Sequence, residues 1–264
     1  MKVSEEELAG AQAYNSLHVP ALFQQWAPQV AEAAGISEGD RVLDVACGTG
    51  VLTLEAQNRV GKTGSVFGLD AMPGMLAVAA ELSPEINWQQ GIAESLPYDD
   101  ESFDAVVSQF GLMFFQDRIA ALTEMSRVAK SESKIAVAVW DAIDNCQVYP
   151  EAVSLFSKLA GLEAADALKA PFALGDRDEL QSIFEQADFD LIDINTKTGK
   201  AQFPNIRVMI EAELRGWLPV MGVHLDEQTI QTILREAEFE FAKYVTTNGT
   251  MEFDVSAHIV SLKV

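Results

Sequence analysis

The stretch from Val42 to Gly50, Val-Leu-Asp-Val-Ala-Cys-Gly-Thr-Gly, decides the fold. A short apolar run leads into a glycine-rich turn, and Val51–Val60 then has the pattern of a helix. Glycines let a ligand approach the backbone closely, and the first turn of a helix offers free N–H groups. The stretch therefore predicts a strand, a tight turn and a helix that together can cradle a ligand.

Strands and helices continue to alternate after this turn. Further strands are expected at 65–70, 86–89, 103–108 and 134–140, and helices at 73–82 and 117–130. The run from Ile135 to Trp140 is apolar at every position, which is typical of a strand buried on both faces of a parallel sheet. Strand–helix repetition with short links favours right-handed crossovers, so the pattern predicts a doubly wound α/β fold.

Helices are expected at both ends of this core. Ser4–Glu7 has the form of a capping box, so a first helix is expected to about Leu17 and a second from Pro20 to Gly35. After Trp140 the pattern predicts helices at 148–162, 176–187, 206–217 and 226–245, and strands at 189–203 and 253–264. The predicted division is a helical lid segment at 1–36, a cofactor-binding core at 37–203, a helical insertion at 204–250 that forms an acceptor lid, and a final core strand at 251–264.

Asp70 ends the second strand, twenty residues after Gly50. An acid at this point can accept hydrogen bonds from both hydroxyls of a ribose. The dinucleotide fingerprint G-x-G-x-x-G fails, because Thr53 stands where its last glycine belongs. Asp44, inside the strand before the turn, would oppose a pyrophosphate but suits a ligand with an ammonium group. S-adenosylmethionine has an ammonium, a sulfonium and no phosphate, so it is the ligand that this pattern favours.

These motifs resemble those of the class I S-adenosylmethionine-dependent methyltransferases, especially the small-molecule branch with the ubiquinone/menaquinone-type C-methyltransferases. The resemblance covers about residues 10–145. Residues 44–50 are similar to the first motif, with Ala46 in place of its first glycine, and 69–72 to the second. Residues 91–97 are similar to the third, with Ile92 in place of a common aspartate, and 103–109 to the fourth strand. The resemblance implies a Rossmann-like, seven-stranded, mostly parallel sheet with helices on both faces and antiparallel last strands.

The resemblance also implies a set of cofactor-binding residues. Asp44 would reach the amino group of the methionine part, Asp70 would hold the ribose, and Met72 would lie against adenine. The full set expected on this basis is Tyr14, Asp44, Ala46, Cys47, Gly48, Gly50, Asp70, Ala71, Met72, Ile92, Ala93, Glu94 and Ser108.

Methyl transfer from a sulfonium has an activated leaving group, so the enzyme mainly positions and desolvates the acceptor. Candidate catalytic residues are Gln109, as a hydrogen-bonding partner of the acceptor, Tyr14, in a segment that closes over the cofactor, and His224, as a base or substrate contact in the insertion. His18, one helical turn after Tyr14, is interpreted as a polar residue of the helix face. No acid follows the fourth strand, so no metal is expected.

The amino-acid composition limits the classes of partner that the chain is expected to bind. The 264 residues include 18 Lys and Arg against 40 Asp and Glu, a net charge of −22. Such a surface repels phosphates and anionic lipids, so neither nucleic acid nor a membrane is expected as a partner. The acidic N-terminus leads into no signal-peptide core, and Cys47 and Cys146 need not pair, which favours the cytoplasm. The expected assembly is a monomer or a homodimer.

The function expected is methyl transfer from S-adenosylmethionine to a small-molecule acceptor, with S-adenosylhomocysteine as the product. The quinone-type relatives suggest a carbon atom as the acceptor, while oxygen and nitrogen stay open. Two alternatives remain at this point. One is a nicotinamide-dependent oxidoreductase on the same kind of sheet. The other is a non-catalytic S-adenosylmethionine-binding protein, which the departure at Ile92 leaves open.

Overall fold

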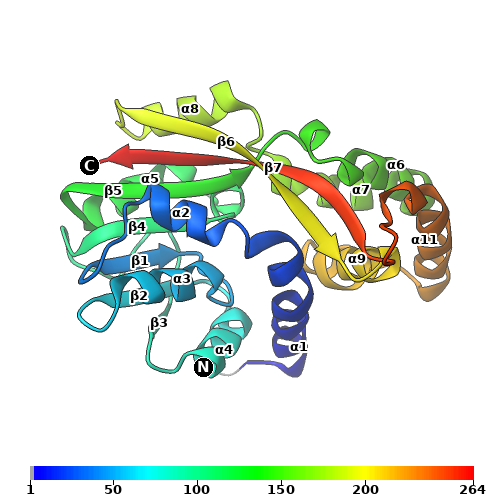
Figure 1. The fold of residues 1–264 in the computed structure, drawn as a ribbon, viewed down its shortest axis with the longest axis horizontal. Helices are drawn as coiled ribbons and strands as arrows, with labels where there is room; N and C mark the ends of the chain where they lie inside the picture. Colours follow the sequence, from blue (N-terminus) through cyan, green and yellow to red (C-terminus); the bar gives the residue numbers. More distant parts are fainter. Residues whose placement is uncertain (1–2) are drawn as a thin grey trace.

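The computed structural model describes residues 3–264, and in these one seven-stranded sheet runs through the molecule in the order β3-β2-β1-β4-β5-β7-β6 (Figure 1). Five strands run parallel: β1 (Arg41–Val45), β2 (Ser65–Asp70), β3 (Asn87–Gln90), β4 (Phe103–Gln109) and β5 (Ala129–Trp140). The strand β7 (Met251–Lys263) is antiparallel to β5 and to β6 (Ile192–Phe203). The predicted Rossmann-like, mostly parallel sheet is confirmed.

Helices cover both faces of the sheet. In Figure 1, α2 (Ala27–Ala33) and α3 (Val51–Val60) lie in front of it and α5 (Arg118–Val128) lies behind it. Because β1 and β4 are covered on both sides, Val42, Val106 and Val107 are fully buried. The remaining described elements near the core are α4 (Pro73–Leu82), α8 (Arg177–Gln186) and short 3-10 turns at Leu112–Phe114, Ile143–Asn145 and Ala170–Phe172. A further 3-10 turn, Ala242–Tyr244, precedes the outer end of β7.

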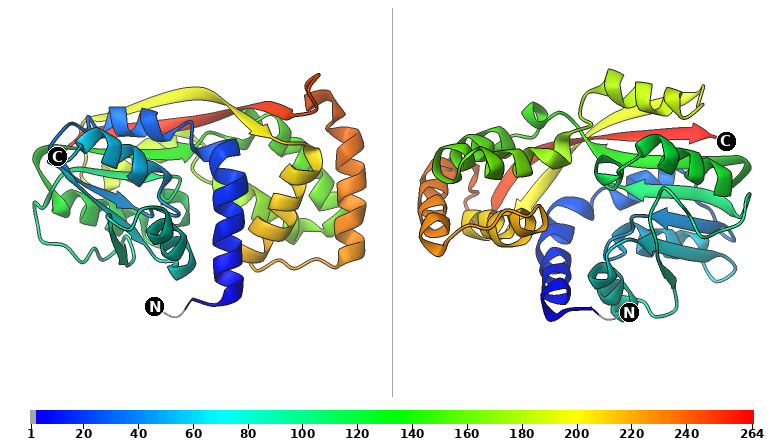
Figure 2. Two further views of the ribbon diagram at one scale, coloured as in Figure 1. Left: turned by 60° about the horizontal axis from the view of Figure 1, so that its bottom comes forward. Right: turned by 180° about the vertical axis from the view of Figure 1, so that it is seen from behind.

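The chain order reverses between β1 and β4, which are neighbours in the sheet. In α/β sheets a ligand binds outside the carboxyl ends of the strands at such a switch point. The N-terminal helix stands in front of these ends, between α4 and the helices of the second half of the chain (Figure 2). The topology therefore places the glycine turn beneath the N-terminal helix.

The N-terminal helix differs from the prediction of two helices meeting at Pro20. The helix α1 (Glu5–Ala13) continues directly into a wider π-helical segment, η1 (Tyr14–Phe23), which contains Pro20. Proline lacks an N–H and its ring clashes with the carbonyl four residues earlier, so a helix that passes through it must widen or bend. Here it widens, and the helix breaks only between Phe23 and α2, with Gln24 N donating to Val19 O.

Strands β6 and β7 extend past the end of β5. The pairing of β7 with β5 covers Ala257–Lys263, whereas its pairing with β6 runs on to Met251. Residues 198–203 and 251–256 thus form a two-stranded extension, called the arm below, which leads away from the sheet in Figure 1. At its far end pack the helices called the helical group: α6 (Val148–Ala160), α7 (Leu162–Lys169), α9 (Ile206–Glu211), η5 (Ala212–Trp217), α10 (Leu218–Val220) and α11 (Glu227–Glu240).

The helix predicted over 148–162 is present as α6 and ends two residues earlier, at Ala160, because Gly161, at φ +94°, separates α6 from α7.

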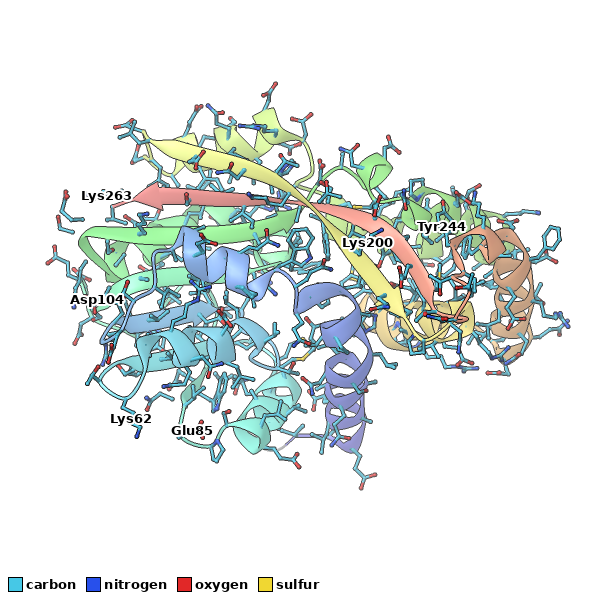
Figure 3. All side chains as sticks on the ribbon, in the orientation of Figure 1. Lys62, Glu85, Asp104, Lys200, Tyr244 and Lys263 are labelled. Atoms are coloured by element: carbon cyan, nitrogen blue, oxygen red, sulfur yellow. The ribbon has the colours of Figure 1, made fainter. Side chains whose placement is uncertain are left out.

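The junction after η1 docks on the arm. Gln25 accepts a hydrogen bond from Lys200 N at 2.8 Å and donates one to Lys200 O at 2.9 Å. Figure 3 labels Lys200 at the place where the arm leaves the sheet. Gln25 thereby satisfies two backbone groups of the edge strand and ties the N-terminal segment to the arm.

Close packing of α1 on α4 depends on Gly74. A Cβ at this position would lie 2.6 Å from the backbone oxygen of Glu7, so α1 would have to shift. We expect Gly74→Ala to lower the free energy of unfolding by about 1–3 kcal/mol. Gly10→Ala, on α1 with nothing within 4 Å of its Cβ, should raise it by roughly 0.5–1 kcal/mol. Urea denaturation of both variants tests this, and equal stabilities would contradict it.

Candidate cofactor and acceptor site

The glycine turn after β1 is built from left-handed backbone. Ala46, Gly48 and Gly50 have φ of +59°, +56° and +93°. The turn is held by Cys47, whose N–H donates to Leu69 O at 3.0 Å and whose carbonyl accepts from Gly50 N at 2.9 Å. A left-handed alanine costs about 1 kcal/mol relative to glycine, which explains why the related motif has glycine where this chain has Ala46.

Asp70 joins the turn to the end of β2. Its carboxylate accepts hydrogen bonds from the backbone N–H groups of Gly48 and Met72, each at 2.8 Å. Burial raises the pKa of Asp70, and these backbone donors oppose the rise. An ionised carboxylate has about four acceptor positions, so two donors leave capacity for ribose hydroxyls.

Asp44 is buried beside the turn with one oxygen free. Its Oδ2 accepts from the Thr53 hydroxyl at 2.6 Å, whereas its Oδ1 is buried without a hydrogen-bond partner. Burial raises the pKa of Asp44 to about 7, and the charge of Asp70 adds to the rise. The Thr49 hydroxyl is likewise buried and unpartnered. A buried carboxylate with a free oxygen is the group that an ammonium would satisfy, so these residues fit the methionine end of S-adenosylmethionine.

Tyr14 lies over the turn. A Cβ on Gly48 would lie 3.9 Å from the Tyr14 ring. Burial raises the pKa of the Tyr14 hydroxyl, and the nearby charges of Asp70 and Asp44 raise it further. The ring also stacks on His18, with 5.7 Å between centroids. The structure thus brings the predicted lid residue to the turn, while its contact with a cofactor stays a prediction.

The predicted adenine side of the site is apolar and open. Met72 is 42% exposed and Ile92 is 53% exposed, whereas Ala93 is buried. The exposed Ala71 accepts a hydrogen bond through its carbonyl from Gln90 at 3.1 Å. Ile92 offers apolar surface where the related motif has a carboxylate.

Glu94 is directed elsewhere. Its carboxylate accepts from the backbone N–H groups of Gln116 at 2.8 Å and Asp117 at 3.3 Å, just before α5. In this structure it therefore holds the loop that precedes α5. A cofactor contact of Glu94 stays a prediction.

The end of β4 carries two further polar side chains with free atoms. Ser108 is fully buried and its Oγ has no partner. Gln109 donates through Nε2 to Phe23 O at 3.2 Å, while its Oε1 is buried without a partner. Phe110 follows in the left-handed region, at φ +58°, and stacks on Trp140 with 4.1 Å between centroids. Backbone strain of this kind concentrates at functional sites.

Unpartnered buried polar atoms gather at this end of the sheet. They are Asp44 Oδ1, Thr49 Oγ1, Ser108 Oγ, Gln109 Oε1 and His18 Nδ1, and the others in residues 3–264 are Trp26 Nε1, Tyr98 OH, Arg118 Nε and Ser133 Oγ. Buried polar groups are normally satisfied, so such a gathering marks a place where a ligand or water belongs. The sequence interpretation missed His18, although its spacing of four residues from Tyr14 places both on one helix face.

Among the remaining candidates, His224 lies apart from this gathering. His224 is exposed in the loop between α10 and α11, so its role stays a prediction. Cys47 and Cys146 are buried and free.

Within residues 3–264, no group of three or more His, Cys, Asp or Glu side chains has the arrangement of a metal site. The same residues include no helix with the length and apolarity needed to cross a membrane.

The strand order, the glycine turn and the acids at the ends of β1 and β2 together define a class I S-adenosylmethionine-dependent methyltransferase. A family model described as "Methyltransferase domain" matches residues 43–137. The demethylmenaquinone methyltransferase of Staphylococcus carnosus (strain TM300) is 32% identical over 203 residues, which cover 70% of this chain and 84% of that protein. The chain belongs to the menaquinone-type family of these methyltransferases.

One further curated relative and one solved structure are also similar to the chain. The chloroplastic 2-phytyl-1,4-beta-naphthoquinone methyltransferase of Arabidopsis thaliana is 39% identical over 120 residues, covering 42% of this chain and 46% of that protein. The fold is similar to that of a solved protein from Anabaena variabilis ATCC 29413, described as a "Putative methyltransferase from antibiotic biosynthesis pathway". The TM-score is 0.66 at 15% identity, and the match covers 91% of this chain and 97% of that one. The enzyme uses S-adenosylmethionine to methylate a small-molecule acceptor and releases S-adenosylhomocysteine. Neither the nicotinamide alternative nor the non-catalytic one gains support.

The unpaired carboxylate of Asp44 predicts opposite effects on stability and on affinity. Its pKa in the folded chain, about 7, lies above the ordinary value of 3.8, so the folded state holds the proton more tightly and the ligand-free enzyme loses stability as pH rises from 3.8 through 7. Asp44→Asn does not titrate. At pH 8 we expect it to be about 1–3 kcal/mol more stable than the wild type without ligand, yet to bind S-adenosylhomocysteine at least about tenfold more weakly.

Chemical denaturation across this pH range and calorimetric titration measure the two effects. The matched control is Asp104→Asn at the other end of the sheet, where Asp104 pairs with Lys130 at 2.6 Å (Figure 3). This variant should leave the affinity for S-adenosylhomocysteine unchanged. Unchanged affinity in Asp44→Asn as well would show that Asp44 is not a ligand of the amino group.

Proposed function

We propose that this enzyme transfers the methyl group to a ring carbon of an uncharged, hydroxylated aromatic acceptor of the naphthohydroquinone class. The observation that carries the proposal is the group of unpartnered polar atoms at the end of β4, beside the cofactor turn. The names of the two enzymes from Staphylococcus carnosus and Arabidopsis thaliana, which act on quinone rings, support the choice of ring.

The hydrogen-bonding inventory supports an acceptor that donates hydrogen bonds. Gln109 donates a hydrogen bond from Nε2 to Phe23 O, and its free Oε1 can only accept a hydrogen bond. His18 Nδ1 and Ser108 Oγ can both accept as well. None of the three groups carries a full charge at neutral pH. A neutral molecule with ring hydroxyls supplies the donors that such acceptors need, whereas a carboxylate would face acceptors without a cation.

Aromatic rings lie beside these polar groups, because Phe23 accepts the Gln109 hydrogen bond through its carbonyl and its ring lies 5.4 Å from that of Tyr14. Phe23 lies 5.4 Å from Phe110 and 5.8 Å from Trp140, centroid to centroid. Phe114, which is 47% exposed, contacts Trp217 of η5 at 5.4 Å. Flat aromatic walls pack against a flat ring through offset or edge-to-face contacts. These residues therefore suit the apolar part of a two-ring acceptor.

The cofactor residues follow from the same geometry. In this proposal Asp44 and the turn around Gly48 hold the methionine part, Asp70 holds the ribose, and Met72 with Ile92 covers adenine. When bound, S-adenosylmethionine supplies an electrophilic methyl group whose bond to sulfur breaks with the electron pair left on sulfur. The chain's part is to hold the acceptor carbon in line with that bond and to exclude water.

The helices of 204–250, together with α6 and α7, form the acceptor lid in this proposal. They reach the site through η5, which meets the N-terminal helix at Gly216, where a Cβ would lie 3.6 Å from His18. His224 is a candidate acceptor contact on the same lid. The two free cysteines support a reducing cytoplasm, and the charge of −22 argues against nucleic acid as a partner. A monomer or a homodimer is the proposed assembly.

The test of the acceptor class uses 1,4-dihydroxynaphthalene under argon with S-adenosylmethionine. We expect a product heavier by one methylene unit that keeps both hydroxyls, located on a ring carbon by NMR. The matched compound 1,4-dimethoxynaphthalene, which has no hydroxyl donors, should give none. Methylation of the dimethoxy compound at a similar rate, or transfer to oxygen of the dihydroxy compound, would refute the proposal.

Gln109→Leu removes the unpartnered Oε1 at the end of β4, together with the Nε2 bond to Phe23 O. We expect this variant to raise KM for 1,4-dihydroxynaphthalene about three- to tenfold, the value of one neutral hydrogen bond. Its affinity for S-adenosylhomocysteine should stay within about twofold of the wild type. A loss confined to the cofactor affinity would instead place Gln109 on the cofactor side of the site.

A further inference from the structure

His18 lies between the cofactor turn and the helical group. On one side its ring stacks on Tyr14, which covers Gly48. On the other side it faces η5, because a Cβ on Gly216 would lie 3.6 Å from its Cε1. His18 therefore lies between Tyr14, which covers the turn, and the proposed acceptor lid.

The imidazole of His18 is held uncharged with a free nitrogen. Its Nδ1 is buried and has no hydrogen-bond partner. Burial lowers the pKa of His18 to about 4, so the ring is neutral near pH 7 and a free nitrogen can accept a hydrogen bond. The buried nitrogen remains costly until a donor reaches it.

The other two histidines of the chain differ in this respect. His258 in β7 is buried, with Nδ1 2.8 Å from the Thr196 hydroxyl and Nε2 3.0 Å from Gly175 O. His224 is exposed to solvent in its loop. His18 is thus the histidine whose free nitrogen no contact in the described chain explains.

We propose that His18 is a catalytic residue that accepts the hydrogen bond, and then the proton, of the acceptor's ring hydroxyl. The assignment rests on the proposed function, since it requires a hydroxylated aromatic acceptor. It adds a residue that the motifs of the cofactor site do not contain. It also explains why a buried nitrogen without a hydrogen-bond partner lies between the glycine turn and the proposed acceptor lid.

The proton balance favours even a weakly basic imidazole. As the ring carbon forms its new bond to the methyl carbon, its π electron pair is consumed and positive charge develops on the hydroxyl oxygen. That hydroxyl becomes strongly acidic, so its proton moves to Nδ1 of His18. Loss of the ring C–H proton to water restores aromaticity, and the imidazolium returns its proton to the oxygen. The net change is one methyl gained and one proton released, with no oxidant or reductant.

Two substitutions separate hydrogen bonding from proton transfer. His18→Phe keeps a ring but removes the nitrogen, and His18→Asn places an amide oxygen near the position of Nδ1. We expect His18→Phe to bind 1,4-dihydroxynaphthalene about three- to tenfold more weakly in the presence of S-adenosylhomocysteine. Its kcat should fall on the order of 10²-fold. His18→Asn should restore the binding, yet keep a kcat lower by at least about tenfold, because an amide takes up no proton.

Calorimetric titration of 1,4-dihydroxynaphthalene and separate measurement of kcat and KM provide these readouts. Ser16→Ala, at an exposed position of the same helical segment, is the matched control and should behave as the wild type in each. An unchanged kcat in His18→Phe would overturn the assignment. A common loss of S-adenosylhomocysteine affinity in both His18 variants would also overturn it, because it indicates a structural role. A wild-type enzyme that neither binds nor methylates 1,4-dihydroxynaphthalene would refute the proposed function itself, and this assignment with it.

Discussion

The carboxylate of Asp70 links the carboxyl ends of β1 and β2, where the candidate site lies. It accepts from Gly48 in the first turn and from Met72 in the second, so one side chain fixes two neighbouring strand ends against each other. The left-handed backbone of the turn needs such a restraint, because Ala46 occupies a conformation that its side chain disfavours. With this bond in place, the free amides around the turn and the Asp44 carboxylate keep a fixed geometry before any ligand arrives. Preorganisation of this kind reduces the entropy lost on binding.

The same end of the molecule carries several local conflicts between side chains and their surroundings. A carboxylate is buried without a cation at Asp44, a phenylalanine is left-handed at position 110, and several polar atoms lack partners. Each feature lowers stability by a small amount, and a core selected for stability alone would not retain them together. The valines of β4 and the paired His258 elsewhere in the sheet show no such conflict. Together these features therefore mark this end of the sheet as the site, although left-handed residues such as Glu101 and Glu132 also occur elsewhere in the chain.

Local patterns predicted the sheet well, because strand, turn and helix are written in neighbouring residues. The turn at 42–50 and Asp70 needed only spacing to be placed, and the structure brings them together. Long-range packing decided the features that were missed. Pro20 signals a helix start, but the helix passes through it by widening, since its face packs against β6 and η5. His18 reads as an ordinary polar residue until the helical group, distant in sequence, covers it. Which of the candidate residues contact the cofactor stays a prediction that spacing alone does not decide.

The hydrogen bonds between Gln25 and Lys200 bear on how ligands enter and leave the proposed site. The N-terminal segment contacts α4 on the core side, η5 on the lid side and the arm through Gln25. In the proposed arrangement a single piece of chain borders both the cofactor half and the acceptor half of the site, so the donor and the acceptor would share one entrance. Opening that entrance for one ligand would expose the place of the other to water. The turnover number would then reflect the motion of this segment as well as the chemistry.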